Sequence, residues 1–223
     1  MDERLGNLLR LVVEEYVSTA EPVGSQALVE RYKLDVSPAT IRNWFAALDD
    51  QGLLMQPHTS GGRIPTEAGF KRYVAAWVVP RPSGKRVKER LAAAAKAEED
   101  RKLKMVAREL AEASGLAAIV AHHESDTYYT GLSELFGQPE FRNWQRVVDM
   151  TQLLDHLDDT LSDLRRQSFP APHILLGKEC PFGPACGSVL ATVPGGMIGI
   201  LGPLRMDYQD ALSNLYSATD ALQ

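Results

Sequence analysis

Arg42 and Asn43 are neighbouring residues whose side chains can hydrogen-bond to base edges in the major groove of DNA. An arginine fork can donate to both acceptors of guanine, and an asparagine amide can pair with adenine. Ala39 and Ala46 are small, so a helix that carries them can approach the bases closely. The pattern favours base readout, and the alternative is a polar helix face without a partner.

These residues belong to a predicted helix that begins at Ser37-Pro38 and ends near Gly52. The Ser37 hydroxyl can accept a hydrogen bond from a free amide of the first turn, and proline suits the first helical position. At about 100° per residue, the candidate DNA-facing residues share one side of this helix, with Thr40 and Arg42 at its flanks. The opposite side, which we expect to be buried, holds Ile41, Phe45 and Leu48, with Trp44 at its edge.

The loop HTSGGRIP, residues 58–65, provides a second candidate contact with DNA. Its glycines, Gly62 among them, give the loop reach, and Arg63 supplies a cation that can enter a minor groove or bind phosphate. His58, Thr59 and Ser60 are candidate hydrogen-bond donors to the sugar-phosphate backbone. A solvated hairpin is the alternative, and for His58 by itself it is the better interpretation.

The elements that must position these residues can be read from apolar spacing and turn signals. Spacings of three and four predict a helix over residues 2–18, and Ser25 can cap a short second helix over 25–32, before the helix that begins at Ser37. Two short strand-like segments, around 53–55 and 63–64, flank the loop, and Thr66 can cap a fourth helix. Three helices and a two-stranded wing form a winged helix-turn-helix, which places its third helix in the major groove. We predict such a DNA-binding domain over residues 1–79.

Residues 80–114 are predicted to form a basic linker helix. Residues 80–108 contain ten Lys and Arg against four Asp and Glu, and residues 85–114 contain no Gly or Pro, which favours one long helix. The apolar stripe of this helix is clearest at Leu103, Val106 and Leu110.

Short β-like runs bounded by Gly or Pro characterise residues 115–223. Residues 143–166 and 207–222 have helical spacing instead, with Asp207 as the cap of the last helix and Arg205 as the partner of a nearby carboxylate. The β-like runs are LAAIVAHH, DTYYTG, HILLGK, GSVLATVP and GMIGILGP. We therefore predict an α+β protein whose second domain contains an antiparallel sheet.

No catalytic or metal-binding constellation stands out in the sequence. Gly-Leu-Ser at 131–133 begins like a nucleophile elbow but lacks the second glycine. His122 and His123 are adjacent, so in a strand they point to opposite faces. Cys180 and Cys186 lack a partner pair for zinc, and a structural metal or a disulfide is the less favoured alternative there. We predict no enzymatic activity, no cofactor and no metal.

Composition sets outer limits on the class of protein. Of 223 residues, 44% are hydrophobic and 24% are charged, which is ordinary for a globular protein and excludes disorder. The net charge of −5 argues against a nucleic-acid partner, but the charges are unevenly placed. The basic cluster at 80–108 can mark an interaction surface, and a solvated helix is the alternative. Acidic residues interrupt the N-terminal apolar pattern, and no uncharged apolar run approaches about 18 residues. We predict a cytoplasmic protein that does not contact a membrane.

Several stretches resemble the HrcA-type heat-inducible transcription repressors. These stretches are EEYVSTAEPVGSQAL, SPATIRN, GLLMQPHTSGGRIPTEAGFKRYV, GLSELFGQPEF and GILGPLRMDY. The resemblance implies a winged-helix domain joined to a GAF-like domain, in a dimer that represses chaperone operons. It also implies an inverted-repeat operator, called CIRCE, as the DNA partner and a GroEL-type chaperonin as a protein partner.

Carried over to this chain, the family's motifs coincide with the residues chosen above. The recognition-helix motif falls on Ser37, Ala39, Thr40, Ile41, Arg42 and Asn43, and the wing motif on His58, Thr59, Ser60, Gly62, Arg63, Pro65 and Thr66. Trp44-Phe45 stands where the family commonly has Asp-Met, and Gly61-Gly62 where it has Ala-Gly. GLAAIVAHHES is followed almost directly by TYYTGLSEL, so the resemblance implies a reduced GAF-like domain over 115–223 that lacks the usual dimerising insert.

Two other functional classes stay open at this point. One is a winged-helix regulator whose GAF-like domain senses a small-molecule effector, and the other is an enzyme built on the C-terminal sheet. For a homodimer without the insert, we favour an interface made by the 85–114 helix and the exposed face of the second domain. The stripe at Leu103, Val106 and Leu110 serves intrachain packing in the alternative interpretation.

Overall fold

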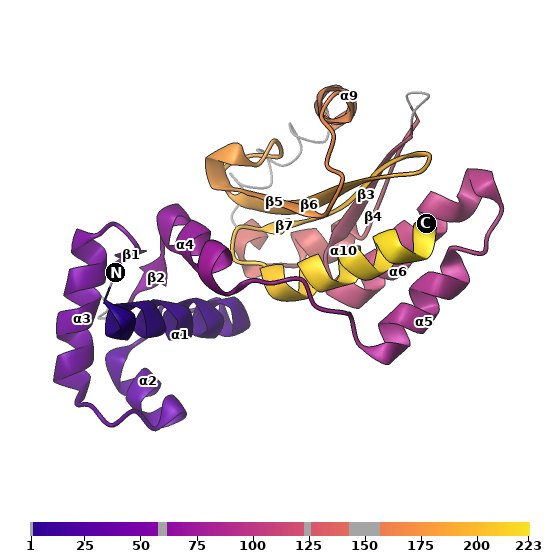
Figure 1. The fold of residues 1–223 in the computed structure, drawn as a ribbon. Helices are drawn as coiled ribbons and strands as arrows, with labels where there is room; N and C mark the ends of the chain where they lie inside the picture. The colour runs from indigo at the N-terminus through magenta and orange to yellow at the C-terminus, as the bar shows by residue number, and fades with distance from the viewer. Residues whose placement is uncertain (1, 58–61, 123–125, 143–156) are drawn as a thin grey trace. The chain divides into compact units, whose positions relative to one another are not determined.

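The computed structural model describes residues 2–57, 62–122, 126–142 and 157–223. The chain forms two compact units, Met1–Val78 and Val79–Gln223 (Figure 1). Several predicted features lie outside the described residues: His58, Thr59, Ser60, His123 and most of the helix predicted over 143–166.

The described residues of unit 1 form four helices and a short two-stranded ladder. The helices are α1 (Glu3–Thr19), α2 (Ser25–Tyr32), α3 (Pro38–Asp50) and α4 (Glu67–Trp77), and the strands are β1 (Leu54–Met55) and β2 (Ile64–Pro65). The strands pair antiparallel, with Leu54 opposite Pro65. Two predicted caps are confirmed, since Ser37 Oγ accepts from the Thr40 amide and Thr66 Oγ1 from the Gly69 amide, each at 3.1 Å. The cap predicted at Ser25 is wrong, because Gly24 is the N-cap of α2 and Ser25 is its first residue.

The core of unit 1 is made by the apolar stripes that the helical spacing predicts. Every helix contributes to it, and burial of each large side chain stabilises the fold by about 1.5 to 3 kcal/mol. The buried members include Leu8, Leu9, Val12, Val13, Leu28, Ile41, Phe45, Leu48, Leu54 and Phe70. The α4 backbone passes so close to the chain before β1 that a Cβ on Gly69 would lie 2.2 Å from the Leu53 carbonyl oxygen.

Unit 2 begins with two helices where the sequence predicts one. The single helix expected over 85–114 is wrong: α5 (Lys85–Ala94) ends, and α6 (Glu99–Ser114) begins after a turn. The two helices pack against each other, and Arg90 of α5 forms ion pairs with Glu109 and Glu112 of α6. Helix propensity is uniformly high across the break, so burial of apolar faces on both helices decides the fold-back.

The five predicted strands form one antiparallel sheet, as expected. They are β3 (Ala117–His122), β4 (Thr127–Thr130), β5 (His173–Leu176), β6 (Cys186–Val193) and β7 (Gly196–Pro203), in the order β4-β3-β7-β6-β5. Helices α6 and α10 (Tyr208–Leu222) pack on one face of the sheet and α9 (Leu157–Arg165) on the other (Figure 1). Leu135 of α7 (Leu132–Phe136) belongs to the same apolar cluster as Leu161 of α9, so α7 covers the same face as α9. Both faces are therefore covered, which explains why β7 is apolar and buried throughout.

The last helix is anchored at its start. Asp207 Oδ1 accepts from the Asp210 amide at 2.9 Å, and Arg205 forms an ion pair with Glu140 in the 3₁₀ helix η1 (Pro139–Arg142). Both interactions agree with the roles predicted for Asp207 and Arg205. A second 3₁₀ helix, η2 (Gly177–Glu179), follows β5.

Candidate nucleic-acid interface

Helix α3 has one buried face and one exposed face. Ile41, Phe45 and Leu48 are 0%, 1% and 0% exposed. The opposite side bears Ala39, Arg42, Asn43 and Ala46, all of them exposed, and Thr40 and Trp44 are half-buried at the borders. The amphipathic division predicted from the sequence is thus confirmed, and the exposed side is a strip of two alanines and two hydrogen-bonding side chains.

The first turn of α3 is ordered by hydroxyl groups. Ser37 caps the helix, and its Oγ lies 3.0 Å from the Thr40 Oγ1. Arg42 Nη1 donates to the Ser25 hydroxyl of α2 at 3.4 Å, a weak bond that leaves most of the five guanidinium donors available. Arg42 and Asn43 are therefore presented side by side on a helix whose start is fixed.

Arg63 is held between the wing and α3. Its Nε donates to Asp49 Oδ2 at 2.7 Å, and the two side chains are 17% and 28% exposed. Its backbone also bridges to Val23, with N–H to O=C distances of 2.8 and 3.0 Å. The sequence suggested a cation that contacts DNA, whereas the observed partner is a carboxylate of α3. The sequence alone does not predict the ion pair between Arg63 and Asp49, because it joins residues of two separate elements.

Gly62 has a packing role that the loop sequence did not indicate. A Cβ at this position would lie 2.8 Å from Pro22 Cβ and 3.0 Å from the Pro22 carbonyl oxygen. Glycine is therefore needed for the close approach of the wing to the α1–α2 connection. In the sequence, the only indication of this packing is the glycine itself, and the need for a flexible, extended loop explains a glycine there equally well.

Many cations of unit 1 are neutralised by neighbouring carboxylates. Arg31 pairs with Glu15 at 2.7 Å, and Lys71 with Glu67 at 3.0 Å. Glu15 also accepts from the Tyr32 hydroxyl at 3.1 Å. Burial, together with this carboxylate, raises the pKa of Tyr32. Within the described part of the chain, the cations of unit 1 without an ion pair are Arg4, Lys33, Arg42 and Arg72.

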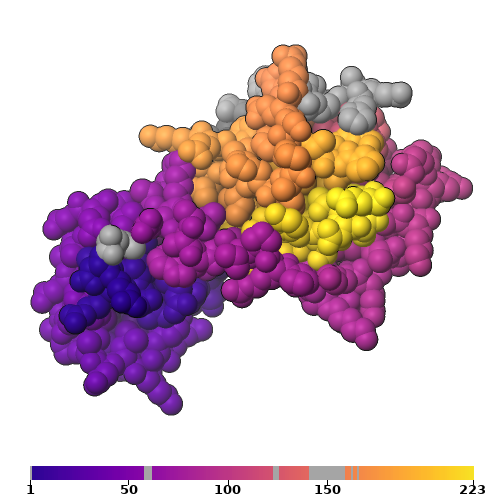
Figure 2. Space-filling view, in the orientation of Figure 1, coloured from indigo at the N-terminus to yellow at the C-terminus, as the bar shows by residue number. Residues whose placement is uncertain are grey.

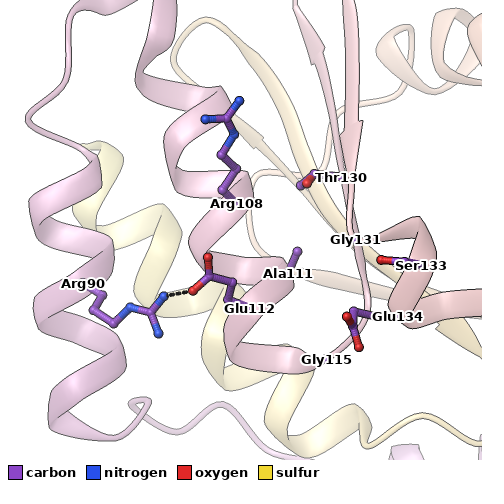
Figure 3. A pocket seen from close by; sticks show the side chains of 9 residues that line it. All are labelled: Arg90, Arg108, Ala111, Glu112, Gly115, Thr130, Gly131, Ser133 and Glu134. Atoms are coloured by element: carbon purple, nitrogen blue, oxygen red, sulfur yellow. Dashed lines mark hydrogen bonds and ion pairs between the residues drawn. The ribbon is translucent and has the colours of Figure 1, made fainter. Parts of the chain in front are cut away.

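Unit 2 contains an open hollow of about 610 Å³ between the α5–α6 pair and the segment from β4 to α7 (Figure 3). Arg90 and Arg108 lie on one side of it, and Ser133 and Glu134 on the other. Arg90 is already paired with Glu109 and Glu112, and Arg108 Nε donates to the Tyr128 hydroxyl at 2.9 Å. Among the described residues that line this hollow, none is a histidine or a cysteine.

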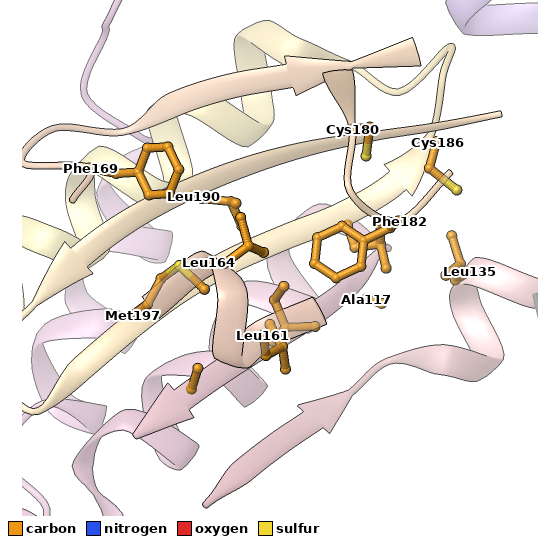
Figure 4. Packing of buried hydrophobic residues seen from close by; sticks show 13 residues of the cluster. Ala117, Leu135, Leu161, Leu164, Phe169, Cys180, Phe182, Cys186, Leu190 and Met197 are labelled. Carbon is orange, nitrogen blue, oxygen red and sulfur yellow. The ribbon is translucent and has the colours of Figure 1, made fainter. Parts of the chain in front are cut away.

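The face of the sheet opposite α6 and α10 is filled with apolar side chains (Figure 4). Leu161 and Leu164 of α9 pack there with Phe169 and Phe182. Cys180 and Cys186 belong to the same cluster as buried thiols rather than a disulfide, and burial raises the pKa of Cys180. Among the described residues, no group of His, Cys, Asp and Glu could hold a metal ion.

None of the helices within the described ranges is long and apolar enough to span a membrane.

Comparison with known proteins relates the chain to one family. The family described as HrcA protein C terminal domain matches residues 77–212. The heat-inducible transcription repressor HrcA of Acidothermus cellulolyticus is 60% identical over 74 residues, which are 33% of this chain and 22% of that protein. The repressor of the same name from Desulfitobacterium hafniense is 53% identical over 74 residues, 33% of this chain and 21% of that protein. The matched stretch thus spans about a fifth of these relatives.

One solved structure has the same fold along the whole chain. It is described as the crystal structure of a hypothetical protein at 2.2 Å resolution, with a TM-score of 0.81 and 15% sequence identity. The likeness covers 100% of this chain and 97% of that chain.

Proposed function

The chain belongs to the HrcA family, and from this premise we propose that it is a sequence-specific DNA-binding repressor of heat-shock genes, without catalytic activity. Unit 1 acts as a winged helix-turn-helix that reads DNA. Unit 2, a reduced GAF-like domain, acts as its regulatory and dimerising partner. The relatives named heat-inducible transcription repressors support this assignment.

The observation that carries the proposal is the exposed face of α3. Ala39 and Ala46 leave room for the base edges, and between them Arg42 and Asn43 present donors and acceptors that fit guanine and adenine. Ser37 and Thr40 lie at the start of the helix, where hydroxyl groups and free amides suit a phosphate. A helix with this face exposed and the other face buried fits the major groove.

The wing supplies contacts to the sugar-phosphate backbone in this proposal. His58, Thr59 and Ser60 donate to phosphate or sugar oxygens, and Gly62 sets the path of the loop against Pro22. Arg63 holds β2 to α3 through Asp49 and offers its remaining Nη donors to a phosphate.

The described residues of unit 1 include few cations without an ion pair, so one copy of the chain can make few contacts with DNA phosphates. We therefore assign a homodimer, which places two copies of unit 1 on an inverted-repeat operator. The interface cannot use the stripe favoured above, because Leu103, Val106 and Leu110 are 3%, 0% and 0% exposed within unit 2. It belongs instead to exposed parts of unit 2. A GroEL-type chaperonin is the protein partner by analogy with the family.

Footprinting on the promoters of the chaperone genes of the source organism tests the proposal, followed by binding measurements on the protected duplex. Arg42→Ala and Asn43→Ala should each weaken binding to that duplex by about 1 to 3 kcal/mol and relax preference at one base pair. Arg72→Ala is the matched control, because Arg72 is an exposed arginine of α4 without an ion pair within the described residues. If the Arg42→Ala variant bound both the specific and the random duplex with the same affinity as the wild type, base reading by α3 would be refuted.

A further inference from the structure

The first residues of unit 2 are fastened to the surface of α10. Gln209 bonds both backbone groups of Val79, accepting from its amide at 3.1 Å and donating to its carbonyl at 2.7 Å. Ser83 is buried, with its amide bonded to Ser217 Oγ at 3.1 Å and its hydroxyl to Asn214 Oδ1 at 2.8 Å. Figure 2 shows this segment running against the yellow α10. Residues between Val79 and Ser83 are thus held in place by side chains.

This fastened segment and the start of α5 carry a cluster of exposed cations, which we call the basic patch: Arg81, Lys85, Arg86 and Lys88. Residues 79–88 contain these four cations and no acidic residue. Arg81, Arg86 and Lys88 have no ion pair within the described ranges, and Lys85 reaches Glu89 only at 3.9 Å. Arg81 and Lys88 line one shallow groove, in which the single acidic residue is Asp220.

The other cations of α5 and α6 differ, because most of them have carboxylate partners. Arg90 pairs with Glu109 and Glu112. Lys102 pairs with Glu99 at 2.5 Å, and Lys104 with Asp126 at 2.9 Å. Four of the exposed cations of residues 80–108 thus belong to the patch, and Lys96 and Arg101, which are also exposed and have no ion pair within the described residues, follow it in the chain.

The position of the patch is unfavourable for the helix that carries it. The N-terminus of a helix has a partial positive charge, so cations in the first turn destabilise the helix. Helix α5 has Lys85 and Arg86 in that turn, no acidic residue there and no side-chain cap. Helix α6, in contrast, has the acidic residues Glu99 and Asp100 in its first turn. Folding of α5 therefore does not account for these cations, whereas an anionic partner does.

We propose that the basic patch binds the sugar-phosphate backbone of duplex DNA beside the segment that α3 reads. This inference rests on the proposed function and adds unit 2 to the DNA-binding surface. Arg81 follows Trp77, the end of α4, by four residues, which is at most about 14 Å of extended chain. Binding by the patch adds phosphate contacts to the few that unit 1, with its paired cations, can make.

The test compares two triple variants of the full chain. Arg81→Gln/Arg86→Gln/Lys88→Gln removes three charges from the patch. Lys96→Gln/Arg101→Gln/Lys178→Gln removes three exposed charges elsewhere in unit 2 and is the matched control. Affinity is measured against salt concentration for the footprinted operator with flanks of about one helical turn, for the same operator without flanks, and for a random duplex of the longer length. Thermal unfolding verifies that both variants are folded.

The patch variant should bind the flanked operator and the random duplex about tenfold more weakly than wild type, with a log–log salt slope smaller by about 2 to 3. Its ratio of specific to random affinity should be unchanged, and the control variant should keep the wild-type slope. Equal salt slopes for wild type, patch variant and control would overturn the inference. If the wild type still preferred the operator in that case, the proposed function would stand. A wild type without operator preference would instead refute the proposed function. Patch-dependent binding to vesicles of phosphatidylserine and phosphatidylcholine, with duplex binding unaffected, would also overturn the inference.

Discussion

The Nε of Arg63 donates to Oδ2 of Asp49 at 2.7 Å, which ties the wing strand β2 to the C-terminal end of α3. Both side chains are largely buried, and the pair lies at the end of the helix away from its capped start. In the proposed function, the angle between α3 and the wing decides whether both can contact DNA at once. This ion pair therefore sets the geometry of the proposed interface.

Removing the pair should destabilise unit 1. We expect Asp49→Ala and Arg63→Ala each to lower the free energy of unfolding by about 1 to 2 kcal/mol, since each leaves a partly buried charge without its partner. The double variant should lose less than the sum of the two. Urea denaturation of the four proteins gives the coupling free energy, and Asp50→Ala, an exposed neighbour, is the control. Strict additivity would show that the two side chains do not stabilise each other.

The cap of α3 should contribute measurably to stability. Ser37→Ala removes the acceptor of the Thr40 amide, so the free energy of unfolding should fall by about 1 kcal/mol. Ser37→Asp should retain most of the stability, because a carboxylate also caps a helix and interacts well with its N-terminus. Denaturant titrations measure both effects. An Asp variant as unstable as the Ala variant would contradict a capping role.

Gly69 should not tolerate a methyl group. Gly69→Ala would place a Cβ 2.2 Å from the Leu53 carbonyl oxygen, and the resulting shift of α4 or of the β1 region should destabilise unit 1 by about 1 to 3 kcal/mol. Gly24→Ala is the control, since a Cβ there has no heavy atom within 4 Å. Comparison of their unfolding midpoints tests the packing, and equal midpoints would argue against it.

Tyr208 should make unit 2 sensitive to alkali. Its hydroxyl donates to the Leu204 carbonyl at 2.8 Å, and burial raises the pKa of Tyr208 well above its ordinary value of 10.0. The unfolded chain ionises near 10.0 while the folded chain keeps the proton, so stability present below pH 10 is lost as the pH rises above it. The loss approaches about 1.4 kcal/mol per pH unit for this one group.

Tyr208→Phe should reduce that alkaline loss, and unfolding measured by denaturant between about pH 8 and 11 follows it. At neutral pH the variant should lose about 1 kcal/mol with the hydrogen bond. Tyr129→Phe, which alters an exposed tyrosine of β4, should retain the wild-type pH dependence. The same slope in all three proteins would exclude Tyr208 as the titrating group.

Local patterns in the sequence were sufficient for much of the secondary structure and for the exposed face of α3. The Ser37-Pro38 start predicts the cap that is observed, and the spacing of Ile41, Phe45 and Leu48 predicts which side of α3 is buried. The five β-like runs bounded by Gly or Pro correspond to β3 through β7. Each of these features depends on residues within a few positions of one another, which is why periodicity and turn chemistry are enough.

Tertiary structure alone decided the features that join distant residues. The sequence from Lys85 to Ser114 has high helix propensity throughout, so only packing of α5 on α6 determines the break between them. The strand order β4-β3-β7-β6-β5 depends equally on long-range pairing. The partner of Arg63 and the attachment of Ser83 to α10 also depend on where other elements lie. The charges were visible in the sequence, but only the fold distinguishes a cation already bound to a carboxylate from one that remains accessible.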